Sequence, residues 1–184
     1  MKNLQERFNS GEIIEFEKPT VVLASASPRR SRLLTEHGVE HVVIVSTVDD
    51  TDINFEHPHE GVSKKQEIEY SKQMALAKLA PFVNKIKNGA VICADTSVFC
   101  AGKILEKLLT VEKCRAQHQF LSGKKNINYT AYAVYYNGVV LCRVMATKVK
   151  IKPLSAELIE QICKEPEILD CAGYRHQGLI APYF

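Results

Sequence analysis

The chain has 184 residues, of which 46% are hydrophobic and 24% are charged, so it has enough apolar surface to bury a core and is not a disordered protein. Its 24 basic and 21 acidic residues leave a formal net charge of +3, far from the dense basic surface that a nucleic-acid-binding domain usually carries. We therefore expect no nucleic acid partner, and any anionic ligand to be small and locally bound.

Residues 1–19 are mixed and charged without a clean period, and we expect them to form a surface arm before a single domain spanning residues 20–184. Apolar runs of strand length, helical spacing and turn residues predict the elements of that domain. In chain order these are a strand at 20–24, a helix at 28–37, a strand at 41–46, a helix at 64–83, a strand at 90–94, a helix at 111–121, two strands between 127 and 151, a helix from Ser155 that ends before Pro166, and an irregular segment at 170–184.

Turn and cap residues support this assignment at two places. Ser27 suits the N-cap of the first helix, Pro28 its first position and Gly38 its end. Asn137-Gly138 favours a type I′ turn because both positions accept positive φ, so the two β-rich runs around it are predicted to form a β-hairpin. The order of elements predicts an α/β fold with a mixed sheet and flanking helices, in place of a doubly wound parallel sheet.

The start of the first helix carries a candidate anion site in the run Ser25-Ala26-Ser27-Pro28-Arg29-Arg30. A helix N-terminus offers unpaired N–H groups and the positive end of the helix dipole, and arginine forks match phosphate oxygens. Arginine in a first helical turn is disfavoured by the dipole, and a bound anion would relieve that conflict. The alternative is that Ser27 only caps the helix and that Arg29 and Arg30 are solvated.

Acidic residues provide two further candidates. Asp95 follows a predicted buried strand, where open α/β sheets place ligand-contacting groups, so it could bind a divalent cation or orient a water; it could equally begin a turn or act as a cap. Asp49, Asp50 and Asp52 also follow a predicted strand. Clustered carboxylates bind Mg²⁺ through oxygen, although acidic loops are also commonly solvated surface.

Several other chemistries lack support. The sequence contains no Gly-x-x-x-x-Gly-Lys-Ser/Thr, Gly-x-Gly-x-x-Gly or Gly-x-Ser-x-Gly run, which argues against a P-loop enzyme, a dinucleotide-binding module and a hydrolase with a serine nucleophile. His57 and His59 lack a partner at a recognised zinc spacing and are interpreted as loop residues. The six cysteines form no Cys-x-x-Cys pair, and we expect them to be reduced thiols of a cytoplasmic protein with no membrane segment.

In their order and spacing these motifs resemble the Maf family over about residues 20–182. The segments that carry the resemblance are Ser25 to Arg30, Asp49-Asp50, Ala94-Asp95-Thr96, residues 102–107, Leu121-Ser122-Gly123, Thr130, Ala172-Gly173 and Gln177-Gly178. The resemblance implies a mixed, curved α/β sheet with a central cleft, as in inosine triphosphatase-like folds, and commonly a homodimer. It also implies a nucleoside triphosphate pyrophosphatase that releases a nucleoside monophosphate and pyrophosphate with a divalent cation, Mg²⁺ or Mn²⁺. The family name is associated with inhibition of septum formation.

The resemblance also implies a substrate branch and roles for individual residues. Ala-Asp-Thr with a late Gln-Gly is similar to the branch that acts on dTTP and UTP, or on related non-standard nucleotides. Asp95 and Lys107 would be catalytic, with Asp95 activating the water that attacks the α-phosphorus, and Asp49 and Asp95 would bind the metal. The substrate-binding residues would be Ser25, Ser27, Arg29, Arg30, Thr96 and Gln177.

The chain departs from the family pattern at several positions. The family normally has a Lys where Met74 stands; Lys78 lies one helical turn further on and Lys72 nearby, so partial substitution is conceivable. Leu108 replaces a usual Pro, and Asn126 stands where His is common. Family members continue beyond the Gln-Gly pair through a strand and a helix, so we expect a sheet edge to be uncovered or covered by dimerisation.

Three hypotheses follow. The first is an active nucleoside triphosphate pyrophosphatase. The second is a degenerate nucleotide-binding or regulatory protein linked to cell division, which keeps the phosphate site and has lost turnover through Met74 and the short C-terminal end. The third, a simple protein-interaction module, must treat Arg29, Arg30 and Asp95 as incidental.

Overall fold

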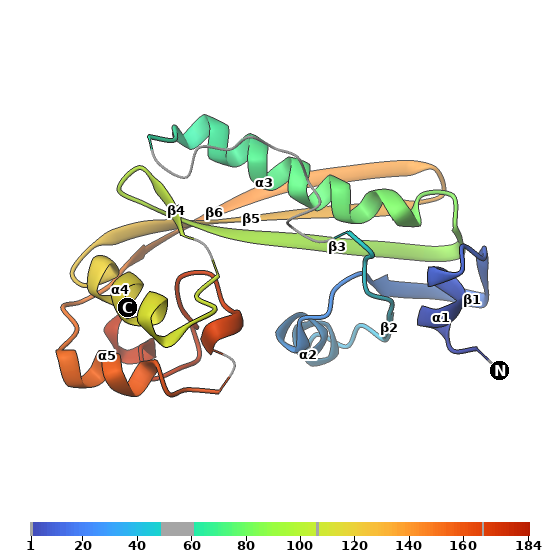
Figure 1. Ribbon diagram of the computed structural model, residues 1–184. Helices are drawn as coiled ribbons and strands as arrows, with labels where there is room; N and C mark the ends of the chain where they lie inside the picture. The colour runs from blue at the N-terminus through green and yellow to red at the C-terminus, as the bar shows by residue number, and fades with distance from the viewer. Residues whose placement is uncertain (1, 49–60, 106, 167) are drawn as a thin grey trace. The chain divides into compact units, whose positions relative to one another are not determined.

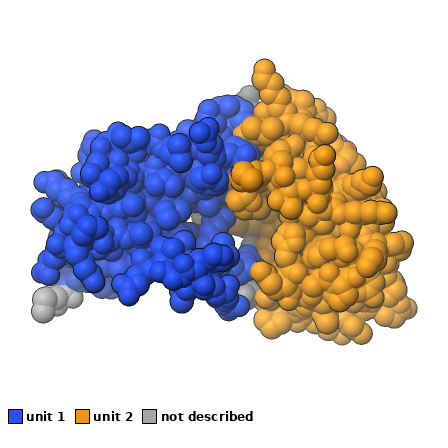
Figure 2. Space-filling view, turned by 180° about the vertical axis from the view of Figure 1, so that it is seen from behind, with its two compact units in different colours: residues 1–56, 69–95, 131–144 blue, residues 57–68, 96–130, 145–184 orange. Residues whose placement is uncertain are grey.

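The computed structural model describes residues 2–48, 61–105, 107–166 and 168–184, and Figure 1 shows their helices and strands. The chain divides into two compact units, which Figure 2 colours separately. Unit 1 consists of residues 1–56, 69–95 and 131–144, and unit 2 consists of residues 57–68, 96–130 and 145–184. Each unit has its own cluster of buried apolar side chains.

Helices and strands are mixed along the chain. In chain order they are α1 (Leu4–Asn9), β1 (Ile14–Leu23), α2 (Pro28–Glu36), β2 (His41–Val43), α3 (Lys64–Leu79), β3 (Ile86–Cys100), β4 (Lys103–Leu105), α4 (Val111–Leu121), β5 (Lys125–Tyr136), β6 (Val139–Lys150) and α5 (Ala156–Ile162), with 3-10 turns at Ala80–Phe82, Ile168–Asp170 and Ala181–Tyr183. The strands form a six-stranded sheet in the order β2-β1-β3-β5-β6, with β4 paired to β3. β1 is parallel to β2 and β3, and β4 is antiparallel to β3, which confirms the predicted mixed α/β sheet.

The register between β1 and β3 sets which part of β3 lies beside the end of β1. Leu23 pairs with Ile92, and the Ala24 N–H donates to the Ile92 carbonyl at 2.9 Å, so the residues after β1 begin beside the middle of β3. β3 continues to Cys100, which pairs with β4. Asp95 therefore lies inside a long strand, and the expectation that it follows the strand's carboxyl end is wrong.

The expected surface arm is wrong for residues 4–9 and 14–19, which form α1 and the first part of β1. Phe8 and Ile14 are buried in the core of unit 1, and the ring of Phe8 stacks on that of Phe82 with centroids 4.3 Å apart. The alternation of apolar and acidic residues from 14 to 17 is the period of a half-buried strand, which the high charge content obscures.

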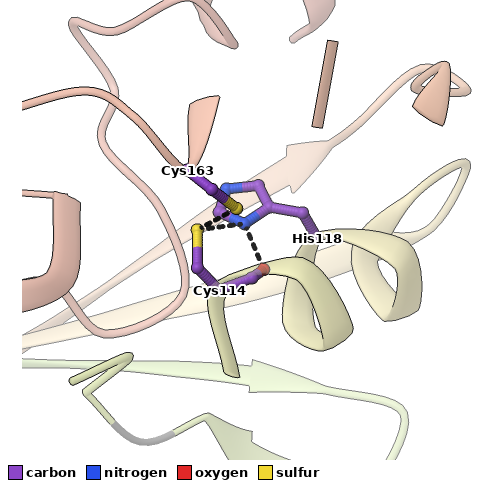
Figure 3. Close-up of side chains that lie close together, drawn as sticks. All are labelled: Cys114, His118 and Cys163. Carbon is purple, nitrogen blue, oxygen red and sulfur yellow. Dashed lines mark hydrogen bonds between the residues drawn. The ribbon is translucent and has the colours of Figure 1, made fainter. Parts of the chain in front are cut away.

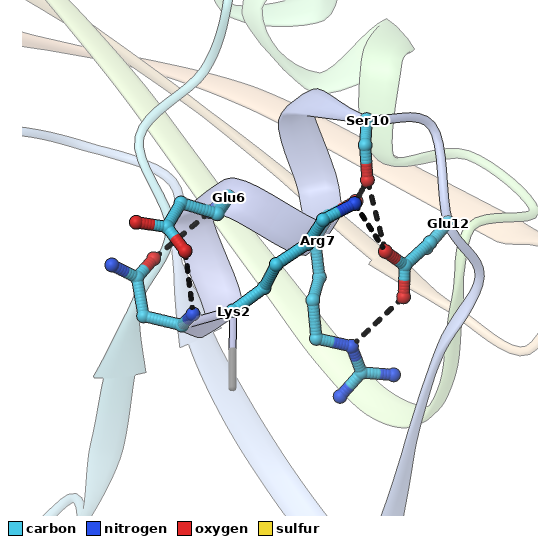
Figure 4. A network of polar contacts seen from close by, with 6 residues as sticks. Lys2, Glu6, Arg7, Ser10 and Glu12 are labelled. Carbon is cyan, nitrogen blue, oxygen red and sulfur yellow. Dashed lines mark hydrogen bonds and ion pairs between the residues drawn. The ribbon is translucent and has the colours of Figure 1, made fainter.

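Polar contacts hold both ends of α1 (Figure 4). At its start, Asn3 Oδ1 accepts from the Glu6 N–H at 2.9 Å while the Asn3 N–H donates to Glu6 Oε2 at 3.0 Å, which is a capping box. Beyond its end, Glu12 accepts from Arg7 Nε at 3.1 Å and from Ser10 Oγ at 2.9 Å, and these two bonds lower the pKa of Glu12. A helix of six residues is too short to be stable alone, so it depends on these caps and on packing.

Two predicted elements are shorter in the structure than the sequence suggested. The strand expected at 41–46 is paired only through Val43, because β1 ends at the paired residue Leu23. The helix expected at 64–83 ends at Leu79 and is followed by a 3-10 turn at Ala80–Phe82, because Pro81 has no N–H to continue the α-helical hydrogen bonds. The predicted helices at 28–37 and 111–121 are confirmed as α2 and α4.

The predicted hairpin is confirmed. β5 and β6 are neighbours in the sheet, and the two residues between them, Asn137 and Gly138, have φ values of 47° and 81°. Both central residues of a type I′ turn need positive φ, and Asn and Gly are the residues that adopt it at low cost. The local sequence alone therefore determines this connection.

Unit 2 packs α4 and α5 in one apolar cluster. The Thr110 hydroxyl caps α4 by accepting from the Lys113 N–H at 3.2 Å, and Ser155 caps α5 as expected, by accepting from the Leu158 N–H at 3.2 Å. In the described part of the chain, no helix is both long and apolar enough to cross a membrane.

Candidate functional site

The loop between β1 and α2 wraps around the hydroxyl of Ser25. This oxygen accepts from the Ser27 N–H at 3.2 Å and from Arg30 Nη1 at 3.1 Å. Ser27 is the N-cap residue of α2, but its side chain makes no capping hydrogen bond, and the first turn of α2 contains no acidic residue. The helix start therefore keeps its positive end without an internal counter-charge, as a site for an anion requires.

Arg30 links this helix start to β3. Its Nη1 also donates to the Ala94 carbonyl at 2.7 Å, and Ala94 directly precedes Asp95 in the strand. The guanidinium group is thus fixed between the loop after β1 and the strand that carries the predicted catalytic carboxylate. The structure brings Arg30 beside the backbone of this strand within unit 1, and a shared role of Arg30 and Asp95 stays a prediction.

Asp95 is paired with a lysine of α3. Lys78 Nζ lies 2.5 Å from Asp95 Oδ1, and the two side chains are only 17% and 15% exposed. An ion pair shielded from water to this extent is screened less by salt than a surface pair. Lys78 therefore holds the carboxylate in a defined orientation.

The buried thiol of Cys93 lies within reach of the charges of Lys78 and Arg30. Burial raises the pKa of Cys93 to about 12, while the positive charges of Lys78 and Arg30 act in the opposite direction. Cys93 stays protonated at neutral pH and is not a nucleophile. Lys78 and Arg30 both act on Cys93, and with the one carboxylate of Asp95 they leave a net positive charge that suits phosphate oxygens.

Helix α3 shows which lysine serves the site. Met74 is 2% exposed and buried in unit 1, so the position where the family normally has a Lys points into the protein interior. Lys72 is exposed and lies 4.0 Å from Glu69 Oε2 on the helix surface. Lys78, one turn beyond Met74, is the lysine that reaches Asp95. Residues 74 and 78 are four apart and so share a helix face, which the sequence shows. The sequence alone does not tell which lysine of α3 contacts Asp95.

The remaining predicted residues divide between other locations. Arg29 is exposed on the first turn of α2. Thr96, Lys107 and Gln177 belong to unit 2: the Thr96 hydroxyl lies 3.1 Å from that of Thr130, Lys107 forms an isolated antiparallel bridge with Ala172, and Gln177 is exposed. The predicted acidic metal ligands Asp49 and Asp50, together with Asp52, His57 and His59, lie outside the described residues.

The glycine of the late Gln-Gly pair has a packing role in unit 2. A Cβ atom at Gly178 would overlap the carboxylate of Glu165, so a larger residue here would require the Glu165 side chain to move. Glu165 Oε1 in turn accepts from the Leu179 N–H at 2.5 Å. This contact anchors the segment that carries Gln177.

Comparison with known proteins identifies relatives over most of the chain. The family model described as "Maf-like protein" matches residues 20–184. The dTTP/UTP pyrophosphatase of Geobacter sulfurreducens is 33% identical over 165 residues, which is 88% of this chain and 82% of that protein. The dTTP/UTP pyrophosphatases of Neisseria meningitidis and Pyrococcus abyssi are each 33% identical, over 87% and 86% of this chain and 79% of their own lengths.

Proposed function

The chain belongs to the Maf family, and we propose that it is a nucleoside triphosphate pyrophosphatase that converts dTTP or UTP to the nucleoside monophosphate and pyrophosphate. The observation that carries this proposal is the grouping of Ser25, Arg30, Lys78 and Asp95 in unit 1. Its cations suit a triphosphate, and its carboxylate suits the activation of water.

Triphosphate binding is assigned to Arg30 and the start of α2. Because Arg30 is already held by Ser25 and Ala94, its charge is positioned before the substrate arrives and costs little reorganisation on binding. The backbone N–H groups at the first turn of α2 add donors for phosphate oxygens. Arg29, exposed on the same turn, contributes to the attraction of the anion.

Hydrolysis is assigned to Asp95. Lys78 binds Asp95 Oδ1, so the second oxygen, Oδ2, is the one that accepts a proton from the attacking water. The water oxygen bonds to the α-phosphorus, the bond from that phosphorus to the bridging oxygen breaks, and pyrophosphate leaves with the electron pair. Lys78 stabilises the carboxylate in its ionised, proton-accepting form.

We also propose a divalent cation, Mg²⁺ or Mn²⁺, at Asp95. The donors fit this group, because Mg²⁺ is usually held by one or two carboxylates together with substrate phosphate oxygens. When bound, such a cation neutralises phosphate charge and increases the acidity of a coordinated water. Asp49 stays the predicted second carboxylate, and a homodimer in the cytoplasm also stays a prediction.

A degenerate nucleotide-binding protein is the second candidate, and one observation favours it. Met74 is buried where the family normally has a lysine, and Lys78 is already engaged by Asp95. If these changes abolish the chemistry while binding persists, dTTP and UTP bind without being cleaved, and Met74→Lys restores turnover.

The test is pyrophosphate release from dTTP, UTP, ATP and GTP with Mg²⁺ or Mn²⁺, using the full chain and Asp95→Asn. Loss of a general base lowers kcat by about 10²–10⁴-fold, so we expect cleavage of dTTP and UTP by the wild type and a loss of this size in the variant. Glu69→Gln, a change of an exposed carboxylate on α3, is the matched control and should leave the rate unchanged. Equal rates in wild type and Asp95→Asn, with thermal melting unaltered, would exclude the catalytic role of Asp95.

A further inference from the structure

A second cluster of chemically active side chains lies in unit 2, apart from every residue used above. Cys114 and His118 stand one turn apart on α4, and Cys163 directly follows α5 (Figure 3). Their potential ligand atoms all lie within 4.8 Å of one another. All three residues are buried, with exposures of 0%, 0% and 4%.

The histidine of this cluster has an unused lone pair. His118 Nδ1 lies 2.8 Å from the Cys114 carbonyl oxygen, an acceptor, so Nδ1 carries the proton and Nε2 is the basic nitrogen. Nε2 is buried and has no hydrogen-bond partner among the described residues.

A carboxylate near the cluster is also incompletely satisfied. Glu165 follows Cys163 by two residues, and its Oε2 is buried without a hydrogen-bond partner in the described part of the chain. Its charge acts on His118, so the two groups are within electrostatic reach of each other. Because a buried acceptor is normally paired, the unpaired Nε2 of a histidine clustered with two thiols indicates a missing positive partner.

The ligand types define the class of this partner. Thiolate sulfur together with imidazole nitrogen is a donor set that zinc prefers, whereas Mg²⁺ prefers oxygen. Two thiolates and a neutral imidazole balance the charge of one Zn²⁺, so the ion would be buried as a neutral complex. We propose that Cys114, His118 and Cys163 bind one zinc ion.

Binding requires a small rearrangement and a release of protons. The two sulfur atoms lie 2.6 Å apart, whereas two sulfurs bonded to zinc at about 2.3 Å in a tetrahedral site are about 3.8 Å apart. Rotation of one cysteine side chain supplies this separation. Each thiol gives its proton to solvent as its sulfur bonds to the metal, so two protons are released for each zinc ion.

The site would tie the two helices of unit 2 together. Cys114 belongs to α4 and Cys163 ends α5, and a bidentate ion pair between Arg115 and Glu160 joins the same two helices at a more exposed position. Because all three ligands are buried and join two helices, binding of the ion contributes to folding. The zinc is therefore structural and separate from the cation proposed at Asp95.

The test uses the full chain, purified without chelator, and measures metal content by mass spectrometry and the absorption spectrum after loading with Co²⁺. We expect about one zinc per chain. After loading with Co²⁺ we expect a thiolate-to-cobalt charge-transfer band, because two of the three proposed ligands are cysteine thiolates. Cys163→Ser and His118→Ala should reduce the metal content to near zero. Cys171→Ser is the matched control, because Cys171 is as buried as Cys163 but lies outside the cluster.

The wild-type measurements decide the matter even if a variant fails to fold. Chelation of the wild type should lower its melting temperature, and zinc should restore it. Absence of zinc and of the cobalt band in the reduced wild type would overturn the proposal, as would metal retention in both variants. A Cys114–Cys163 disulfide in protein that binds no metal after reduction would overturn it as well and would assign the pair a redox role.

Discussion

At the scale of single residues, Lys78 is the lysine of α3 that contacts Asp95. Its ammonium group lies 2.5 Å from Asp95 Oδ1. Positions 74 and 78 are one helical turn apart, so their side chains leave the same face of α3. We propose that Lys78 supplies the positive charge that the family resemblance led us to expect at position 74.

We predict that Lys78→Ala lowers the kcat for pyrophosphate release. Removing one preorganised group that stabilises the reacting charges costs about 10²–10³-fold in kcat. The reaction rates with dTTP and UTP measure the effect at saturating Mg²⁺. The variant also leaves Asp95 without its ion-pair partner, so the orientation of the carboxylate is lost together with the positive charge.

Lys72→Ala controls for the removal of a lysine from α3. Lys72 is exposed and lies beside Glu69 on the helix surface, so its loss should change neither rate nor stability by more than a small amount. If Lys78→Ala is as active as Lys72→Ala, Lys78 has no part in the reaction. The double variant Met74→Lys/Lys78→Met then tests whether the site accepts the family arrangement.

At the scale of elements, Tyr174 connects the segment after α5 to β5. Its hydroxyl donates to Asn126 Oδ1 at 2.8 Å and lies 3.2 Å from Asn128 Oδ1, and all three side chains are buried. Burial raises the pKa of Tyr174 to about 12, although the bonds to the two asparagines act in the opposite direction. Asn126, which stands where the family commonly has His, thus has a structural partner in this chain.

The burial of Tyr174 predicts an alkaline loss of stability. Between pH 10 and pH 12 the unfolded tyrosine loses its proton while the folded one retains it, so the free energy of unfolding falls as pH rises through this window. Tyr174→Phe removes this dependence but loses the hydrogen bonds. We therefore expect the stability difference between wild type and variant to be largest near neutral pH and to shrink above pH 10 in urea unfolding curves.

Tyr136→Phe provides the control for this measurement. Tyr136 ends β5 and is 49% exposed, so its replacement removes a tyrosine hydroxyl without disturbing a buried contact. Its replacement should leave the pH dependence unchanged. A constant difference between wild type and Tyr174→Phe from pH 7 to pH 12 would show that Tyr174 keeps its ordinary pKa.

At the scale of the whole molecule, the core of unit 1 includes residues that precede the family match. The match begins at residue 20, yet Phe8 and Ile14 are 2% and 1% exposed and pack with Phe82 and other core residues. The segment before residue 20 is therefore needed to complete the packing beside the strand that leads to Ser25.

We predict that Phe8→Ala destabilises the protein by about 3–5 kcal/mol, the usual cost of removing a buried phenylalanine. The stacked ring of Phe82 would lose its partner, and the cavity could be only partly refilled. Ile13→Ala, at a side chain that is 54% exposed, should change stability by about 0.5 kcal/mol or less. Equal unfolding free energies for the two variants would show that α1 contributes nothing to the core.

The local signals in the sequence were sufficient where one segment determines its own structure. Ser27 and Pro28 begin α2, Thr110 and Ser155 precede their helices, and Asn137-Gly138 forms its turn, because caps and turns depend on backbone conformation within a few residues. The Ser-x-Ser-Pro-Arg-Arg run is likewise a local signal, and by itself it predicts an anion site and indicates the family.

Tertiary structure decided which of the candidate groups meet. Arg29 and Arg30 look equivalent in the sequence, but only the pairing of β1 with β3 sets Arg30 against Ala94. The packing of α3 buries Met74 and turns Lys78 toward Asp95, and the packing of α4 and α5 brings Cys163 to Cys114. These contacts join residues between 17 and 64 positions apart in the sequence. Short-range propensities cannot encode them, because strand register and the burial of apolar faces determine which distant residues come into contact.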